Sequence, residues 1–282
     1  MPVLPIAVTG ATGEGGGRVA RLLAAEGTPQ RLLVRDLARA PQLPGTTAVR
    51  APYGDAAAVR EALAGTSTVL MVSASETADR VEQHRTFIDA AADAGVEHLV
   101  YTSFFGAAPD ATFTLARDHW ATEQHIRDRG LLATFLRDQC YLDSLVEYVG
   151  ADGAIRGPAG EGRVAGVARD DVARAAAAVL RDPGAHAGRT YSLTGPEALT
   201  LAEVAAVISA GTGRAVRYEP ETLEEAHRSR ASYGAADWQV EAWVSTYTAI
   251  ADGSLAGVTG DVPELTGHPA TSLAQLLRTA QG

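Results

Sequence analysis

The apolar residues of this chain form short runs that alternate with longer segments of helical spacing. Each run has four or five residues, rich in Val, Ile, Leu and Thr, a composition typical of buried strands. The longer segments place apolar residues three and four positions apart, as amphipathic helices do. We therefore predict strands at Ile6–Thr9, Arg31–Val34, Thr47–Arg50, Thr68–Val72, His98–Thr102 and Thr134–Arg137, with helices at 16–26, 56–64, 79–94 and 115–129 between them.

This alternation predicts a doubly wound α/β sheet over the first half of the chain. A helix that connects two neighbouring strands makes them parallel, and such sheets are covered by helices on both faces. Ligands of open parallel sheets bind beyond the carboxyl ends of the strands. We therefore expect functional residues directly after the predicted strands.

After Arg137 the alternation of strand and helix patterns becomes less regular, and glycines separate several short segments. We predict a domain over 1–150 that carries the sheet, and a smaller C-terminal α/β lobe over most of 151–282. Segment 168–198 is expected to return to the first domain. The later elements are predicted as helices at 170–181, 201–211, 223–231, 236–252 and 272–280, with a strand at 190–193.

The charge of the chain argues against a nucleic acid partner. It has 282 residues with a net charge of -10, and no cluster of basic residues reverses that charge locally. Its 24 basic residues are all arginine, so a lysine nucleophile or Schiff base is impossible. We expect no metal, since the seven histidines lack ligand spacing, and no membrane partner, since no apolar stretch approaches about 20 residues. The single Cys140 and the lack of a secretion signal predict a cytoplasmic location.

A glycine-rich turn follows the first predicted strand directly. Gly10, Gly13 and Gly16 stand at three-residue steps between that strand and the first helix. Glycines at these places permit a tight turn, close approach of the backbone to a pyrophosphate, and close packing of the helix on the strand. The amides at the helix N-terminus attract the anion. We therefore predict a dinucleotide site in a Rossmann-like sheet.

The residues after the second strand bear on the choice of dinucleotide. An acidic residue there usually holds the ribose hydroxyls of NAD, whereas arginine accommodates the 2'-phosphate of NADP. Arg35 stands at this point, with Arg39 one turn later, and favours NADP(H) over NAD(H). Asp36 is the competing feature because it could turn toward an adenosine ribose. An exposed Arg35 with no role is the alternative.

Five segments together resemble the NmrA-like atypical short-chain dehydrogenases, and among them the NADPH-dependent quinone oxidoreductase type. They read GATGEGG, LLVRD, YGD, AGVEHLVYTSFFGA and LTGPEALTLAEVAAVIS, and the resemblance covers nearly the whole chain. It implies a Rossmann domain, a small substrate lobe and a cleft that holds substrate against the nicotinamide. The pattern is far more specific than any one motif.

The resemblance also implies roles for individual residues. The pyrophosphate loop corresponds to Gly10, Thr12, Gly13 and Gly16, and the 2'-phosphate contact to Arg35. Asp55 corresponds to the residue near the adenine. The stretch beside the nicotinamide ribose corresponds to Ser73 and Ala74, and the segment facing the nicotinamide to Thr102, Ser103 and Phe104.

The usual catalytic pair of short-chain dehydrogenases, Tyr-xxx-Lys, is impossible without lysine. His119 and Glu123 stand four residues apart on the predicted helix 115–129, so the carboxylate could orient the imidazole and raise its pKa. We predict that His119 and Ser103 polarise the substrate. The alternative for His119 is a structural hydrogen bond.

Aromatic residues predict a planar, conjugated substrate. Phe104, Phe105 and Tyr141 are expected to line its site, although aromatics at such spacings also serve as core. Trp238 and Trp243 could close a wall of that site or form an interface in a homodimer. Two functions remain open. The first is a reductase of quinones or related conjugated carbonyls, which includes a biosynthetic tailoring reductase with a narrower substrate. The second is a non-catalytic NADP(H) sensor that acts through a protein partner.

Overall fold

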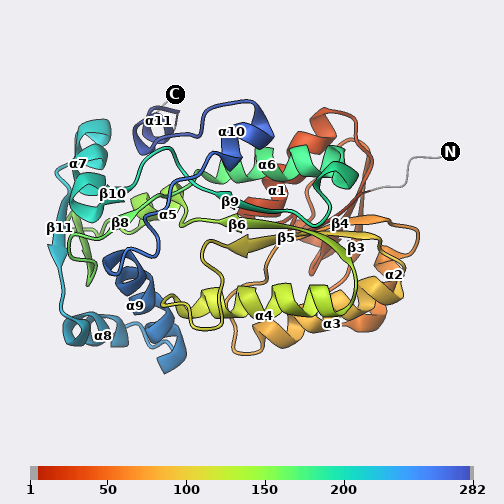
Figure 1. Cartoon of the computed structure of the whole chain (residues 1–282), viewed down its shortest axis with the longest axis horizontal. Coiled ribbons are helices and arrows are strands. Elements are labelled where there is room, and N and C mark those ends of the chain that lie inside the picture. The colour runs from red at the N-terminus through yellow and green to blue at the C-terminus, as the bar shows by residue number, and fades with distance from the viewer. Residues whose placement is uncertain (1–5, 280–282) are drawn as a thin grey trace. The chain divides into compact units, whose positions relative to one another are not determined.

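The computed structural model describes residues 6–279 and contains one large sheet with helices on both faces (Figure 1). Ala280, where the last helix was expected to end, lies outside the described residues. The seven strands of the sheet follow the order β3-β2-β1-β4-β5-β6-β9. Their bounds are β1 Ile6–Thr9, β2 Gln30–Val34, β3 Thr46–Arg50, β4 Thr68–Met71, β5 His98–Phe104, β6 Leu132–Asp138 and β9 Thr190–Leu193.

The strand order confirms the predicted Rossmann-like, doubly wound sheet. β1 pairs in parallel with β2 on one side and with β4 on the other, and parallel pairing continues to β3 and β5. The direction of winding reverses between β1 and β4, which is the switch point where such sheets bind ligands. All six strands predicted before residue 140 are present, with bounds that differ by at most two residues.

The helices divide between the two faces of the sheet. α1 and α6 lie on one face, and α2, α3 and α4 lie on the other (Figure 1). Their apolar residues fill the space against the strands, and Phe87 and Ile88 of α3 are completely buried. The bounds are α1 Glu14–Ala25, α2 Ala56–Leu63, α3 Arg80–Asp93, α4 Thr114–Asp128 and α6 Arg169–Arg181.

The chain forms two compact units, and each unit is made of segments that are separated in the sequence. The first unit takes in the chain up to Ser103, Asp118–Arg137 and Val172–Tyr191. The second contains Phe104–Arg117, Asp138–Asp171 and the chain from Ser192 onward. Residues 172–191 therefore belong to the first unit, although residues 138–171 directly before them belong to the second.

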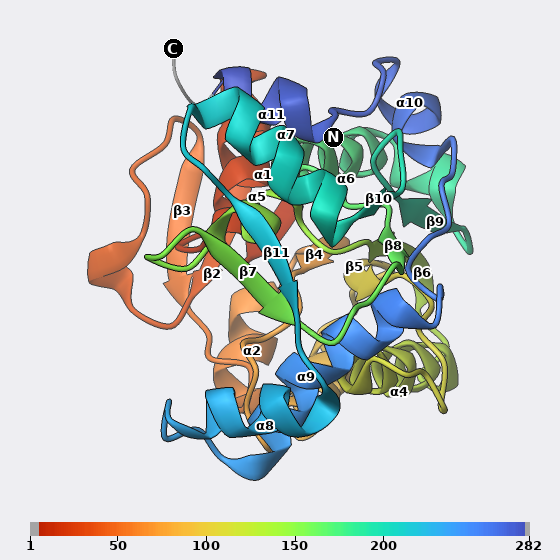
Figure 2. The ribbon, with the colours of Figure 1, turned by 90° about the vertical axis from the view of Figure 1, so that its left-hand side faces the viewer.

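The second unit is built on a short parallel pair, β7 Ala154–Gly157 with β11 Arg217–Pro220, which lie side by side in Figure 2. Thr200 caps its helix α7 Leu201–Thr212 in a reciprocal bond with Glu203, which satisfies two free amides at the helix start. β8 Arg163–Val164 and β10 Leu199–Thr200 form a second small ribbon. The remaining elements of this unit are α5 Leu142–Glu147, α8 Leu223–Ala231, α9 Asp237–Ala251, α10 Asp261–Thr266 and α11 Leu273–Thr279. The 3-10 helices η1 Leu37–Arg39 and η2 Pro183–His186 belong to the first unit.

Helix α1 packs closely against strand β1 at Gly16. A Cβ atom added there would lie 2.2 Å from the carbonyl oxygen of Thr9 and 2.6 Å from the carbonyl carbon of Gly10. Both obstacles are backbone atoms, so α1 could accept a side chain only by moving away from β1.

We predict that Gly16→Ala lowers the free energy of unfolding by about 2 kcal/mol, the usual cost of overpacking. Gly15→Ala is the control, because its Cβ would meet only Val72 Cγ1 at 3.8 Å. The control should stay within about 1 kcal/mol of the wild type, since alanine favours the helix. Denaturant unfolding of the three proteins measures both, and equal stability of the two variants would contradict the packing argument.

Candidate functional site

The glycine loop lies at the switch point of the sheet. Gly10 follows β1 with a φ of 63°, a left-handed conformation that favours glycine. A Cβ atom on Gly10 would approach Val72 Cβ, just past β4, to 3.1 Å. The ends of β1 and β4 are thus adjacent, as the dinucleotide prediction requires.

The start of α1 presents backbone donors without a capping side chain. Gly13 is the N-cap residue; it forms backbone hydrogen bonds with Gly10 and Gly17 and offers no side-chain cap. The first amides of a helix lack intrahelical acceptors and carry the positive end of the helix dipole, so they bind anions. Gly13 is exposed, and within residues 6–279 the Thr12 hydroxyl has no hydrogen-bond partner. This cradle of glycines and amides fits a pyrophosphate.

The two charged residues after β2, Arg35 and Asp36, have different surroundings. The Asp36 carboxylate accepts a hydrogen bond of 2.9 Å from the Ala38 amide and caps η1. That bond holds Asp36 to its own turn. Arg35 is exposed, and no carboxylate of the described chain pairs with it. A guanidinium without a protein counterion at this strand end fits a phosphate.

Asp55 has a structural role in addition to the one implied for it. Its Oδ1 accepts from the Ala58 amide at 3.1 Å and caps α2, and its Oδ2 lies 3.9 Å from Arg50 Nη1. Beside it, the Tyr53 hydroxyl bonds the Thr9 hydroxyl and donates to the Val72 carbonyl at 2.5 Å. Tyr53 was not singled out from the sequence, because its partners belong to strands distant in the chain.

Side chains from helix α3 and strand β5 hold the segment after β4. The Thr102 hydroxyl accepts from the Ser73 amide at 2.8 Å. The Ala74 amide donates to His84 Nε2 at 2.9 Å, and the Ala74 carbonyl accepts from Arg80 Nε at 3.0 Å. Ser73 and Ala74 are therefore fixed at the end of the sheet before any ligand binds.

His119 belongs to the same buried network, and its predicted pairing with Glu123 is wrong. Arg80 Nη2 lies 3.0 Å from His119 Nε2, and Tyr101 Oη lies 3.0 Å from Nδ1. Because a guanidinium only donates, Nε2 must accept and Nδ1 must carry the hydrogen. Burial, followed by the positive charge of Arg80, lowers the pKa of His119 well below its usual value. The imidazole is neutral at pH 7, where a carboxylate partner was expected to raise its pKa.

Glu123 binds different partners. It is completely buried, and its carboxylate accepts from the Ser103 hydroxyl at 2.6 Å and from Arg137 at 2.7 and 2.8 Å. Arg127 adds a contact of 3.2 Å. The Ser103 hydroxyl thus donates its hydrogen inside the protein. A polarising role for Ser103 or His119 stays a prediction, and both side chains also have structural bonds that explain them.

The three predicted substrate residues lie in the second unit. Phe104 packs against Phe113, with ring centres 4.7 Å apart, and Phe105 lies against Gly257, where an added Cβ would come within 2.7 Å of its ring. The Tyr141 hydroxyl donates to Asp138 Oδ2 at 2.9 Å. All three are half-buried, so each keeps some exposed ring surface.

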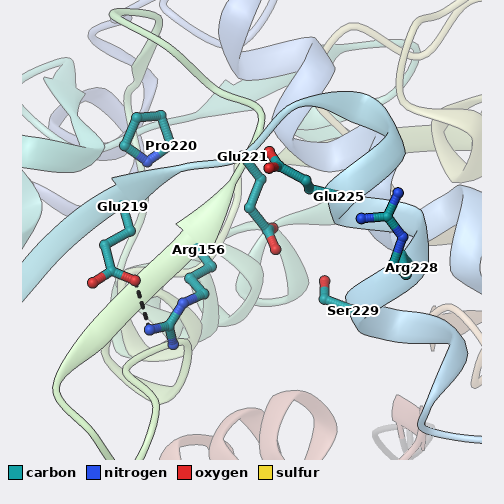
Figure 3. Close-up of a pocket in the computed structure, with 7 residues that line it drawn as sticks. All are labelled: Arg156, Glu219, Pro220, Glu221, Glu225, Arg228 and Ser229. Atoms are coloured by element: carbon teal, nitrogen blue, oxygen red, sulfur yellow. Dashed lines mark ion pairs between the residues drawn. The ribbon is translucent and has the colours of Figure 1, made fainter.

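A pocket of about 360 Å³ in the second unit contains none of the predicted site residues (Figure 3). Arg156 pairs there with Glu219 at 2.5 Å, and the Glu225 carboxylate accepts from the Thr222 amide that begins α8. Arg228 pairs with Glu224, outside the lining. Arg156 and Arg228, the two arginines of the lining, thus both pair with glutamates.

Two further features of residues 6–279 bear on the class of site. No group of three or more His, Cys, Asp or Glu residues in this range is arranged to hold a metal ion. None of the helices in the same range has the length and apolar character needed to cross a membrane.

The family model described as the NmrA-like family matches residues 4–234 of the chain. An NAD(P)H azoreductase of Xenophilus azovorans is 36% identical over 279 residues, which cover 97% of this chain and 96% of that protein. Both proteins therefore align along nearly their whole length.

Solved structures extend the similarity to the fold. An NADPH-dependent quinone oxidoreductase of Escherichia coli complexed with NADPH has a TM-score of 0.90 at 33% identity, covering 98% of this chain and 100% of that one. A triphenylmethane reductase of Citrobacter sp. complexed with NADP(H) has a TM-score of 0.86 at 32% identity, covering 98% and 99%.

The Glu123 cluster yields a prediction about stability. Glu123→Gln removes the charge that two guanidinium groups share, so the free energy of unfolding should fall by about 3 kcal/mol. Asp93→Asn is the matched control, since Asp93 forms an exposed pair with Arg129 at 3.1 Å and should cost less than about 1 kcal/mol. Denaturant unfolding measures both, and a loss at Glu123 no larger than at Asp93 would show that the buried pair contributes little.

Proposed function

The chain belongs to the NmrA-like family, and on this basis we propose that it is an NADPH-dependent reductase that transfers a hydride to a quinone or a related conjugated carbonyl compound. The observation that carries the proposal is the glycine cradle at the switch point, followed by an exposed arginine after β2. When bound, the reduced nicotinamide supplies the hydride. The chain itself must bind the two reactants, orient them and manage the proton.

The pyrophosphate is assigned to the loop of Gly10, Thr12, Gly13 and Gly16, because it combines a left-handed glycine with amides that no side chain caps. The 2'-phosphate is assigned to Arg35, whose charge has no partner within the described chain. Asp55 near the adenine remains part of the proposal, alongside its role as a cap.

The nicotinamide end is assigned to the residues after β4 and β5. Ser73 and Ala74 are held by Thr102, His84 and Arg80, which supports a preformed strand end. A preformed site lowers the cost of ordering the protein when a ligand binds. Ser103 completes this set, because its hydroxyl bond to Glu123 fixes the end of β5.

The first unit is proposed to bind the cofactor, and the second to supply the substrate residues Phe104, Phe105 and Tyr141. The three similar proteins are named for azo, quinone and triphenylmethane compounds, all of which are conjugated acceptors. A planar, conjugated small molecule is therefore the proposed substrate. A homodimer and a cytoplasmic location stay predictions from the sequence, as does the alternative of a non-catalytic sensor, which no contact in the structure favours.

The reductase proposal predicts oxidation of NADPH that depends on an acceptor. The test follows NADPH absorbance with a panel of quinones, enones and azo compounds, with NADH measured in parallel. Turnover with at least one acceptor is expected. If NADPH binds but no acceptor of the panel is reduced, the proposal fails and the sensor alternative gains support.

The assignment of Arg35 predicts a selective loss of affinity. Arg35→Ala should weaken NADPH binding by about tenfold or more, the usual value of a hydrogen bond to a charged group, and leave NADH binding nearly unchanged. Arg60→Ala, at an exposed arginine on α2, is the control and should affect neither cofactor. Calorimetric titration measures the affinities, and equal losses for NADPH and NADH would refute a 2'-phosphate contact.

A further inference from the structure

Reduction of a quinone carbonyl consumes a proton as well as a hydride, and the inference below rests on the proposed function. The donors predicted from the sequence are engaged elsewhere, since His119 is neutral with both ring nitrogens bonded and Ser103 donates to Glu123. The basic residues are all arginine, which keeps its proton at physiological pH. Carboxyl groups and tyrosines at the strand ends are the side-chain proton donors considered next.

Asp138 is a buried carboxyl group at a strand end where ligands are expected. It is the last residue of β6, and its carbonyl accepts from the Phe105 amide at 2.9 Å, so it lies beside the end of β5. The residue is 2% exposed. Its Oδ2 meets the Tyr141 hydroxyl, and its Oδ1 has no hydrogen-bond partner within residues 6–279.

The charged groups around Asp138 are directed to other partners. Arg169 of α6 lies over the Tyr141 ring at 5.2 Å and pairs with Glu147 at 3.2 Å and Asp143 at 3.9 Å. Burial raises the pKa of the neighbouring Cys140 thiol to about 12, so it carries no charge. Arg137, one residue earlier, binds Glu123.

A buried carboxylate with one hydrogen bond and no cation is costly, so the neutral acid is favoured. Burial accordingly raises the pKa of Asp138 to about 8, although the hydrogen bond from Tyr141 acts in the opposite direction. The group therefore holds a proton at neutral pH. A carboxyl group kept protonated in an apolar site is suited to general acid catalysis.

Tyr141 is the direct partner of this buried acid in the second unit. Its hydroxyl touches Asp138, and burial, followed by the nearby Asp138 carboxyl, raises the pKa of Tyr141 well above its usual value, while the residue as a whole is half-buried. We propose that Asp138 and Tyr141 form the proton-donating pair of the reduction, in which Tyr141 contacts the substrate oxygen and Asp138 stores the proton behind it. The sequence predicts Tyr141 only as a residue that lines the substrate site, and its pattern does not single out Asp138.

The proposed step is balanced in protons and electrons. The substrate gains two electrons and one hydrogen as hydride, which leaves one quinone oxygen as an anion. The Tyr141 O–H bond breaks and its proton forms an O–H bond with that oxygen, while the Asp138 carboxyl proton moves to the Tyr141 oxygen. The product is the hydroquinone, and Asp138 is left as a carboxylate. Water returns a proton to Asp138 through Tyr141 before the next turnover.

The first test measures kcat against pH for the wild type, D138N and Y141F. The acid form is the active one, so wild-type kcat should fall as the pH rises through about 8. D138N keeps a similar shape but has no acidic proton, so it should lose about a hundredfold in kcat and lose the decline above pH 8. Y141F keeps the ring under Arg169 and should lose kcat to a similar degree, with little change in KM.

Two matched variants serve as controls. Asp171 is another buried carboxyl of the second unit, but it accepts from the Thr271 amide at 2.7 Å, so D171N should retain the decline above pH 8. Y233F alters a tyrosine that is 73% exposed and should retain wild-type kcat. If D138N keeps the wild-type pH profile while the wild type reduces quinones, the pair is overturned and the proposed function stands.

The second test needs no substrate and distinguishes the two failures. Because the pKa of Asp138 is raised from 3.8 to about 8, the folded protein holds a proton that the unfolded chain releases. Wild-type stability therefore falls as pH rises from about 4 to 8, and the fall stops above that range. The melting temperature of the wild type should drop relative to D138N across this window. A constant difference would show that Asp138 is ionised when folded and would overturn the proposal.

Discussion

The contact between Gly16 and the Thr9 carbonyl sets the geometry on which the rest of the first unit depends. It brings the start of α1 against the end of β1, so that uncapped amides lie beside the switch point of the sheet. A helix held farther away would keep its dipole but aim its amides past the strand ends. The proposed fit of this site to a phosphate therefore depends first on packing and second on charge.

Buried polar side chains also hold the neighbouring strand ends in place. Thr9 bonds Tyr53 and accepts from the Val72 amide, and Thr102 accepts from the Ser73 amide. These hydroxyls replace the ladder bonds that β1, β4 and β5 lose where they diverge, so the backbone stays satisfied without water. Such a site is ordered before its ligand arrives, which lowers the cost of ordering the protein on binding.

The sequence predicts the sheet well because strand and helix periodicity are local properties. Each strand before residue 140 was found within two residues of its observed bounds. The predicted pairing of His119 with Glu123 is wrong because the partners of a side chain depend on residues that are distant in the sequence. Spacing of i, i+4 places two side chains on one helix face, but the partners come from other elements, namely Arg80 of α3 and Arg137 of β6, which are stronger donors. β7 and β11 were missed, and each forms its pair with a strand about 60 residues away in the chain.

The arrangement of the sheet has a consequence for biosynthesis. β9 comes from residues 190–193 and forms one edge, next to β6, which ends at residue 138. On the ribosome, more than fifty residues must be made after β6 before its neighbour exists, and until then an apolar strand has open hydrogen-bonding groups. The nascent chain is thus exposed to wrong pairing for the whole of that interval. Residues 138–171 of the second unit are synthesised within it, and the partners of β7 and β8, which are β11 and β10, follow only after β9, so these strands also wait for later parts of the chain.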